Sequence, residues 1–198
     1  DYKFRTEVKL EDPEDEDGGF KFIQNSGIRD YYIKQDLTWI PNPKHTVKFG
    51  ANYIYHIFTP NSVSAKFGDI VYDDTDGRKQ YAHEAALYIG DDFKINDKLT
   101  IYAGVRGSGF MQVGKFTRYV KDELLIQNID TIVYEKGEKV AFYKSFEPRA
   151  SLKFSLNEKS SIKASFMQNK QYVHLASLSA STLPTDLWVP CSDIVKPQ

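Results

Sequence analysis

Apolar and polar side chains alternate with a period of two along most of the chain. In residues 146–156 the alternation is complete: Phe146, Pro148, Ala150, Leu152, Phe154 and Leu156 alternate with Glu147, Arg149, Ser151, Lys153 and Ser155. This period places the two sets on opposite faces of a β-strand, whereas a helix would scatter each set around its axis. The same pattern predicts seven strands, over residues 2–10, 29–40, 45–58, 80–95, 99–106, 146–156 and 160–171.

The lengths of the strands and of their connections are informative. Most of the predicted strands span 9 to 16 residues, whereas strands of soluble proteins centre on about 5–6. Residues 41–44, 96–98 and 157–159 form short connections rich in Asn, Asp and Pro, which suit tight hairpins. The connections between them are long, roughly 11–28, 59–79, 112–144 and 172 to the end. In an up-and-down meander this alternation places every tight turn at one rim and every long loop at the other.

Two β architectures fit this meander. Outer-membrane barrels have short turns at one rim, long loops at the other and aromatic girdles at both membrane interfaces. A soluble up-and-down barrel alternates as well, with its apolar face inward, and alternation alone does not fix which face points in. Strand length, loop asymmetry and aromatic residues near strand ends favour lipid; these are Tyr31, Trp39, Tyr53, Tyr55, Phe93, Phe110 and Phe146.

Composition narrows the function without defining it. Aromatic residues make up 14 % of the 198 residues, which is typical of pleated surfaces. The net charge of −1 gives no electrostatic reason to expect a nucleic-acid partner. Cys191 is the single cysteine, which excludes an internal disulfide and a cysteine-based zinc site. The chain opens on Asp1 inside an alternating segment without a signal peptide, so we expect a processed chain or a piece of a larger protein.

Several segments near the C-terminus resemble one family. They are FEPRASLKF at 146–154, LNEKSSIKAS at 156–165, QYVHL at 171–175, LPTDLWVP at 183–190 and KPQ at 196–198. Together they resemble the barrel of TonB-dependent outer-membrane receptors, and NPKHTVKFGANY at 42–53 resembles an earlier hairpin of the same barrels. The likeness is dense over 146–198 and looser over 27–60.

The resemblance implies a fold and partners that the residues alone do not reveal. It implies a barrel of about 22 strands in the outer membrane of a gram-negative bacterium, closed by an N-terminal plug. The plug region binds the TonB motor complex. We therefore expect residues 1–198 to be part of such a barrel domain, with neither plug nor C-terminal strand. Expected partners are outer-membrane lipid and lipopolysaccharide; a surface lipoprotein, as in starch-utilisation-type receptors, is left open.

Candidate sites follow from the polar face and from the last connection. Tyr172, His174 and Trp188 are expected to contact a ligand by stacking, the alternative being loop-on-loop packing. A second set is expected on the lumenal face, in contact with the plug or as a solvated channel wall: Arg106, Glu147, Arg149 and Lys153. Acidic runs at 12–17 and 73–77 lack the spacing of a calcium loop and favour solvated loops.

We therefore predict an all-β, antiparallel, up-and-down transmembrane β-barrel segment of an active transporter. The ligand class is left open among siderophores, cobalamin-like molecules, glycans and peptides. The sequence contains no nucleophile–base motif or phosphate-binding glycine loop, so we expect neither an enzyme nor a bound cofactor or metal. One alternative is a soluble β-sandwich or barrel that serves as a ligand-binding or adhesin module, and another is a passive porin.

Overall fold

The chain is built from β-strands that form one large antiparallel sheet. In this computed structural model, residues 1–10, 20–67, 70–73, 79–121, 128–176 and 187–198 are described. No helix long enough and apolar enough to cross a membrane is found in these ranges. The strands are β1 (Tyr2–Leu10), β2 (Phe20–Asn42), β3 (His45–Phe67), β4 (Ile70–Asp73), β5 (Gln80–Lys94), β6 (Leu99–Val113), β7 (Phe116–Lys121), β8 (Asn128–Tyr134), β9 (Lys139–Asn157), β10 (Ser160–Met167), β11 (Val173–Ala176) and β12 (Leu187–Pro190).

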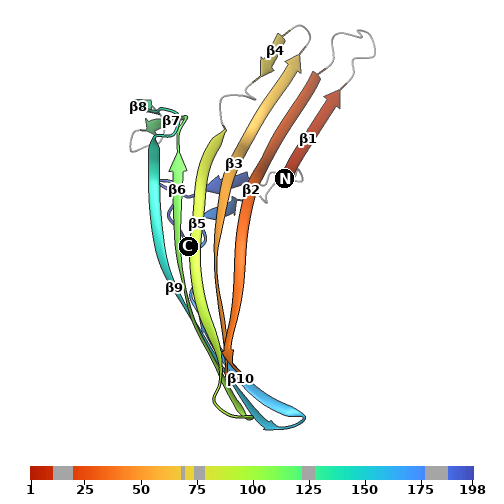
Figure 1. Cartoon of the computed structure of the whole chain (residues 1–198). Coiled ribbons are helices and arrows are strands. Elements are labelled where there is room, and N and C mark those ends of the chain that lie inside the picture. The colour runs from red at the N-terminus through yellow and green to blue at the C-terminus, as the bar shows by residue number, and fades with distance from the viewer. Residues whose placement is uncertain (11–19, 68–69, 74–78, 122–127, 177–186) are drawn as a thin grey trace.

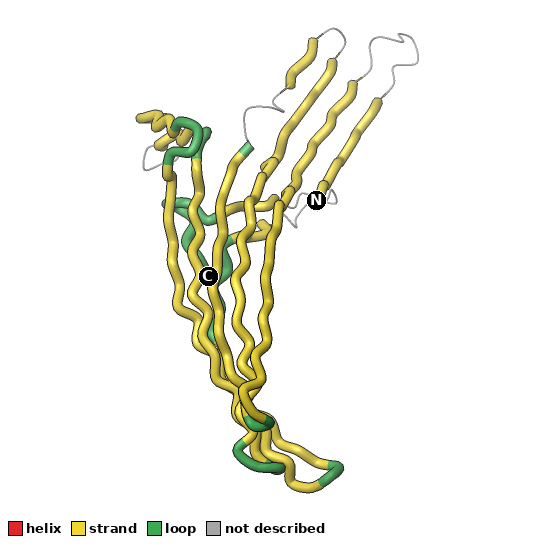
Figure 2. Tube along the Cα trace, viewed as in Figure 1, coloured by secondary structure: helices red, strands yellow, loops and turns green. Residues whose placement is uncertain are grey.

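The large sheet follows chain order. Its strands are hydrogen-bonded in the order β1-β2-β3-β5-β6-β9-β10, with β4 added beside β3, while β7–β8 and β11–β12 form separate two-stranded sheets. Figure 1 shows the large sheet curling like part of a barrel wall, and Figure 2 shows its short turns gathered at one end. The seven predicted strands and the up-and-down order are therefore confirmed.

Several strands extend further than predicted at the end opposite the tight turns, whereas β10 ends at Met167, short of the predicted residue 171. Strand β2 begins at Phe20, β3 continues to Phe67 and β9 begins at Lys139, so parts of the predicted long connections are strand instead. Between β8 and β9 the chain turns, with Gly137 at a φ of +82°, but these two strands do not form a hairpin, because β8 pairs with β7 and β9 pairs with β6.

Each tight turn is closed by one asparagine side chain. The Oδ1 atoms of Asn42, Asn96 and Asn157 accept a hydrogen bond from the backbone N–H two residues later, at 2.9 Å in every case. Asn96 Oδ1 accepts a second one from the N–H of Leu99 at 2.9 Å. These Asx turns explain why the sequence Asn-x-Lys recurs at all three positions.

The convex face of the sheet is apolar and exposed. Directly paired residues of neighbouring strands share a face, and the register joins Ala51 to Leu87, Leu87 to Gly107 and Gly107 to Phe146. Leu87 is 69 % exposed and Phe146 69 %. The apolar residues that a soluble barrel would bury together lie on this face instead, and none of them is buried: Leu87, Ile101, Leu152 and Phe154. The predicted orientation toward lipid is therefore confirmed.

Aromatic side chains border this apolar band on the side away from the tight turns. Tyr31, Tyr53, Tyr55, Tyr81 and His83, here called the aromatic row, cross β2, β3 and β5. The Tyr55 ring lies 6.4 Å from that of Tyr31 and 6.3 Å from that of Tyr81, and the Tyr53 hydroxyl lies 2.7 Å from His83 Nδ1. Near the turns, Trp39 and Phe93 occupy the same face. This is the arrangement of two membrane interfaces.

Phe110 does not belong to these interfaces, contrary to the prediction. It lies on the concave face and is fully buried. Its neighbours along β6, Gly109 and Met111, point to the convex side, because successive side chains alternate. At the end of β6 the convex face carries small residues such as Gly109. Apolar and polar side chains therefore do not alternate clearly there, and the sequence predicts the two faces poorly.

The orientation of β1 is also the reverse of the prediction. Lys3 pairs with Gly27 and Arg5 with Asn25, and β2 continues without interruption from these positions to Arg29 and Tyr31 on the convex face. The charged side of β1 is therefore convex, and its apolar side is concave, where Tyr2 contacts Trp188 at 5.6 Å. The reason is the position of β1 along the membrane normal. It pairs with the part of β2 that extends beyond the aromatic row, so its convex side chains lie outside the apolar band.

Candidate functional site

The concave face contains a row of alternating charges that crosses five strands. We call it the lumenal ladder; it consists of Asp30, His56, Glu84, Arg106, Glu147 and Arg149. His56 Nδ1 lies 2.8 Å from Asp30 Oδ1, and His56 Nε2 lies 3.7 Å from Glu84 Oε2. Arg106 lies 3.7 Å from both Glu84 and Glu147, and Arg149 lies 3.7 Å from Glu147.

The register of the sheet explains how residues distant in sequence form this row. Asp30 pairs with His56, and Arg106 pairs with Glu147. Glu84 lies diagonally between these pairs, since it opposes Ile54 on one side and Phe110 on the other, and diagonal neighbours remain within reach of long side chains. Each carboxylate thus has a cationic or imidazole partner on an adjacent strand, which offsets part of the cost of burying charge.

The chain after β10 leaves the sheet and packs onto this concave face. The hydroxyl of Ser108 donates to Glu147 Oε1 at 2.5 Å and lies 2.9 Å from the hydroxyl of Tyr172. Arg149 donates to Asn169 Oδ1 at 2.9 Å. Residues 168–176 and 187–198, here called the inner segment, are therefore connected to the ladder by hydrogen bonds.

A small apolar core lies beneath the inner segment. It consists of Phe58, Ala82 and Phe110 from the sheet together with Tyr172 and Cys191. Tyr172 stacks on Phe110 with ring centroids 5.3 Å apart and planes 10° from parallel. Burial raises the pKa of the Tyr172 phenol above its ordinary value of 10.0, because the charged form would lose its hydration.

Cys191 is buried in this core and is a poor nucleophile there. Its side chain has no exposed surface, and burial raises the pKa of its thiol to about 11. His174 Nε2 lies 3.3 Å from its sulfur. A thiol with so high a pKa is almost entirely protonated near neutral pH, so Cys191 has a packing role.

A cavity of about 370 Å³ opens between the ladder and the inner segment. On the sheet side it is lined by Asp30, His56 and Glu84, and the other lining residues are Ile28, Lys170, Gln171, Tyr172, Val173 and Trp188. Two of its nitrogen atoms, His56 Nε2 and Trp188 Nε1, are buried and have no hydrogen-bond partner among the residues that the structure describes. His56 is only 3 % exposed. Buried polar atoms are normally hydrogen-bonded, so these two point to a ligand or solvent in the cavity.

The structure brings together some of the predicted site residues and separates others. Tyr172 and Trp188 line the cavity, whereas His174 is not among its lining residues and contacts Cys191 instead. Arg106, Glu147 and Arg149 belong to the ladder; Lys153 lies further toward the tight turns on the same strand and face, outside the ladder. The acidic run at 12–17 and residues 74–77 of the run at 73–77 lie outside the described residues.

Sequence reasoning missed the sheet side of the cavity. Asp30, His56 and Glu84 lie on the polar face of their strands, as alternation predicts, but the residues two positions before and after each of them, which share its face, are apolar or uncharged. The signal that could have found them is a row of opposite charges on successive strands at matching heights. Among the described residues, no group of three or more His, Cys, Asp or Glu side chains is placed to hold a metal ion.

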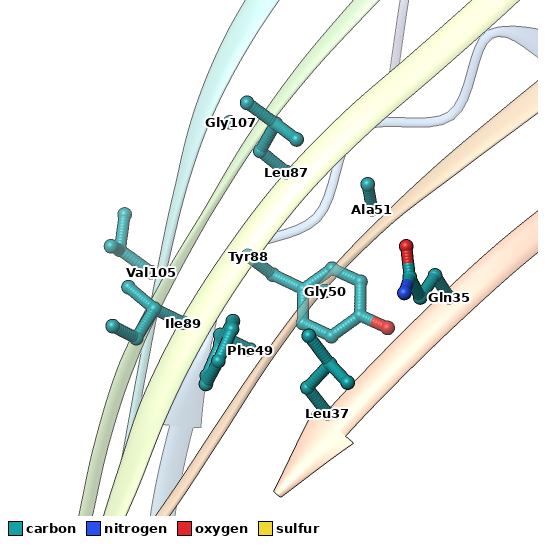
Figure 3. A pocket seen from close by; sticks show the side chains of 10 residues that line it. All are labelled: Gln35, Leu37, Phe49, Gly50, Ala51, Leu87, Tyr88, Ile89, Val105 and Gly107. Carbon is teal, nitrogen blue, oxygen red and sulfur yellow. The ribbon is translucent and has the colours of Figure 1, made fainter. Parts of the chain in front are cut away.

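A second hollow, of about 510 Å³, lies against the apolar band. Figure 3 shows Leu37, Phe49, Leu87, Ile89 and Val105 around it, from four neighbouring strands. Among its described lining residues, the Tyr88 phenol is the only ionisable group. This is an apolar surface suited to hydrocarbon.

Comparison with known proteins gives one match. The family model described as "TonB dependent receptor-like, beta-barrel" matches residues 5–171. This range covers most of the chain and, apart from the first residues of β1, the seven strands β1, β2, β3, β5, β6, β9 and β10 of the large sheet. No curated protein matches the chain. No solved structure matches it either.

Proposed function

The chain belongs to the family of TonB-dependent-receptor-like β-barrels, and from this premise we propose that it imports a hydroxyl-rich nutrient, such as an oligosaccharide. The family fixes the general setting, which is TonB-dependent transport across the outer membrane of gram-negative bacteria. The ligand class and the residues that contact the ligand are the proposal. The cavity between the ladder and the inner segment is the observation on which it depends.

The two unpartnered nitrogens of the cavity suit hydroxyl groups. Trp188 Nε1 can only donate a hydrogen bond. His56 Nδ1 faces the Asp30 carboxylate at 2.8 Å, and Nε2 lies 3.7 Å from the Glu84 carboxylate. A hydroxyl group both donates and accepts, so it can pair with Nε2 whichever protons the ring carries, and one type of ligand group satisfies both atoms. The indole of Trp188 adds an apolar surface of the kind that stacks on a sugar ring.

The charges around the cavity favour a neutral ligand. The Asp30 and Glu84 carboxylates lie beside His56 and Arg106, and Lys170 is also in the lining. Positive and negative groups are therefore nearly balanced. A strongly charged ligand such as a ferric siderophore would find no complementary excess of charge.

We further propose that the ladder and Lys153 form the wall against which the plug packs. Arg106 and Arg149 are partly exposed toward the lumen, and Lys153 is exposed on the same face. Ion pairs of this kind contribute only about 0–1 kcal/mol each when solvated. Many weak contacts suit a domain that must be held in place and then displaced by TonB.

Binding by the full-length purified receptor tests the ligand class. We expect binding to a glycan on an array of bacterial, plant and host oligosaccharides, weakened by about tenfold or more in Trp188→Ala because stacking and one hydrogen bond are lost. Trp39→Ala is the matched control, since Trp39 is the other tryptophan and lies on the convex face. His56→Ala and His83→Ala form a second matched pair.

Two results would contradict the proposal. Binding of ferric siderophores or corrinoids together with no glycan on the array would exclude the ligand class. Equal affinity of the wild type and Trp188→Ala for a bound glycan would exclude the cavity. If the proposal holds, uptake of that glycan by intact cells stops when a protonophore removes the energy that TonB delivers.

A further inference from the structure

Three tyrosine side chains lie on the concave face between the cavity and the tight turns. We call them the tyrosine path: Tyr32 of β2, Tyr88 of β5 and Tyr102 of β6. Tyr32 follows Asp30, which lines the cavity, by two residues on the same face of β2. Tyr88 pairs directly with Arg106 of the lumenal ladder, and Tyr102 lies four residues from Arg106 along β6. All three therefore share the face that carries the ladder.

The three tyrosines are evenly spaced in the direction of the strands. Tyr32 pairs with Ile54 of β3, and Tyr88 pairs with Gly50, four residues closer to the tight turns. Tyr102 pairs with the residue of β5 that is again four positions closer to the turns than Tyr88. Each step therefore covers about 13 Å along the strands. Since the tight turns lie on the periplasmic side in barrels of this type, the tyrosines lead from the cavity toward the periplasm.

Glycines allow the rings of Tyr88 and Tyr102 to lie against the sheet. A Cβ atom at Gly50 would lie 2.8 Å from Cζ of Tyr88, whose ring lies over Gly50 in Figure 3. A Cβ atom at Gly90 would lie 2.8 Å from Cζ of Tyr102, and one at Gly104 would lie 2.6 Å from its hydroxyl. Each ring thus occupies the space of missing side chains, with one face on the backbone and the other toward the lumen.

The lumenal face of the Tyr88 ring is accessible to a partner. The Tyr88 hydroxyl donates a hydrogen bond to Asp36 on β2, which holds the ring in place. Lys34 Nζ lies 5.9 Å from the ring centroid and pairs with Asp36 at 2.8 Å. The Lys34 side chain is 42 % exposed, and solvated pairs of this kind are weak, so another group can displace it from the ring. Tyr32, at the start of the path, is itself 59 % exposed.

Short side chains surround the rings on β3, β5 and β6. They are Gly50, Asn52, Ala86, Gly90 and Gly104. Charged side chains border this strip on β2, on β9 and near the turns: Lys34, Asp36, Arg149, Lys153, Lys48 and Asp92. A strip of short side chains and flat rings offers few fixed ion-pair partners. It therefore suits a molecule that moves along it.

We propose that the tyrosine path guides the ligand from the cavity toward the periplasm once TonB has displaced the plug. The inference rests on the proposed function, because the ring of a tyrosine stacks on the apolar face of a sugar. A chain of several sugar rings can reach the next tyrosine before it leaves the previous one. Stacking contacts of similar strength at regular steps then keep the ligand on the wall without holding it tightly at any one position.

The experiment separates uptake from binding. Cells that produce the full-length receptor take up the radiolabelled glycan that binds most tightly on the array described above, and the purified receptor gives its Kd. In Tyr88→Leu/Tyr102→Leu we expect the maximal uptake rate per surface receptor to fall about fivefold, because two stacking contacts are lost. The Kd should change less than twofold, since neither residue lines the cavity. Tyr102→Phe retains the ring and should take up the glycan at nearly the wild-type rate.

A pair of glycines on β6 supplies the matched control. Gly104→Ala should push the Tyr102 ring off the wall and slow uptake, whereas Gly107→Ala adds its methyl group on the convex face, where no atom lies within 4 Å, and should not. Equal unfolding midpoints establish that the variants are folded, and Tyr32→Leu replaces the double variant if that variant is not.

The outcomes distinguish the path from the proposed function. Wild-type uptake by the folded double variant, with the glycan still bound, would overturn the path and leave the proposed function intact. A loss of binding that matches the loss of uptake would also overturn the path, because the tyrosines would then belong to the binding site. A wild-type receptor that binds no glycan would overturn both.

Discussion

The ring of Tyr172 stacks on the ring of Phe110, with centroids 5.3 Å apart and planes within 10° of parallel. Phe110 is part of the sheet, whereas Tyr172 follows β10 at the point where the chain turns onto the concave face. The Tyr172 hydroxyl also lies 2.9 Å from Ser108. One side chain therefore connects the inner segment both to the apolar core and to the lumenal ladder.

Removal of this side chain should release the inner segment. We expect Tyr172→Ala to lower the local opening free energy by about 3 kcal/mol, through lost packing and a lost hydrogen bond, and Tyr172→Phe by only about 1 kcal/mol. Hydrogen exchange of residues 187–195 in the full-length receptor measures both. Equal protection in the wild type and Tyr172→Ala would show that other contacts hold the segment.

The fold was largely predictable because alternation is a local signal. Apolar and polar residues alternate in each of the seven strands that follow one another in the large sheet, and the Asn-x-Lys turns define the hairpins at one rim. The reversal of β1 was not predictable, because alternation identifies two faces without saying which one is convex. Which face of β1 is convex depends on the position of the strand along the membrane normal, and only its register with Gly27 and Asn25 of β2 shows that position.

The candidate site was predictable only in part. Tyr172 and Trp188 were recognisable as aromatic residues in a connection, but the cavity that they line needs Asp30, His56 and Glu84 from three other strands. Their convergence is a consequence of sheet register over long sequence distances. His174 was expected beside the ligand, and it contacts Cys191 because β11 pairs with β12 in a register that turns it toward the core.

Alkaline pH should loosen the inner segment. The pKa of the Cys191 thiol is raised from 9.0 to about 11 in the folded protein, so the unfolded state loses its proton first as the pH rises. Between pH 9 and 11 the folded state binds more protons than the unfolded state, and stability therefore falls over this window. The raised pKa of Tyr172 acts in the same direction at higher pH.

Cys191→Ala provides the control for this effect. We expect the inner segment of the wild type to lose about 1–2 kcal/mol of stability by pH 11, and the variant to lose less. Hydrogen exchange corrected for its intrinsic pH dependence measures both. Maleimide labelling at pH 8 should also be slow, since about one thiol in a thousand is ionised there. Rapid labelling of the folded wild type at pH 8 would contradict the burial of Cys191.

A charge introduced into the apolar band of the convex face should destabilise the barrel in the membrane. Leu87 is 69 % exposed and lies in the apolar band four residues from the aromatic row. Leu87→Arg should destabilise the barrel by about 2–4 kcal/mol, as cations do near the middle of a bilayer. Leu87→Ala should cost far less, because no packed core surrounds the side chain. Urea unfolding in phospholipid vesicles compares the two, and equal midpoints would mean that this face does not contact lipid.

Glu147 should contribute more to stability than other charged residues of the lumenal wall. It is 3 % exposed, accepts a hydrogen bond from Ser108 and lies 3.7 Å from both Arg106 and Arg149. Its removal leaves two cations without a shared carboxylate. Since both arginines retain some contact with water, we expect Glu147→Leu to cost about 1–2 kcal/mol, less than a fully buried pair.

Lys153→Leu supplies the comparison, because Lys153 lies on the same strand and face with an exposed side chain and should change the unfolding midpoint little. The double variant Arg106→Met/Glu147→Leu shows whether the loss of stability comes from the interaction between Arg106 and Glu147 or from each substitution on its own. If Arg106 and Glu147 interact, the two substitutions together cost less than the sum of their separate effects. Strict additivity in urea unfolding would show that the 3.7 Å approach has no energetic consequence, and that the ladder is an arrangement of independent charges around the lumen.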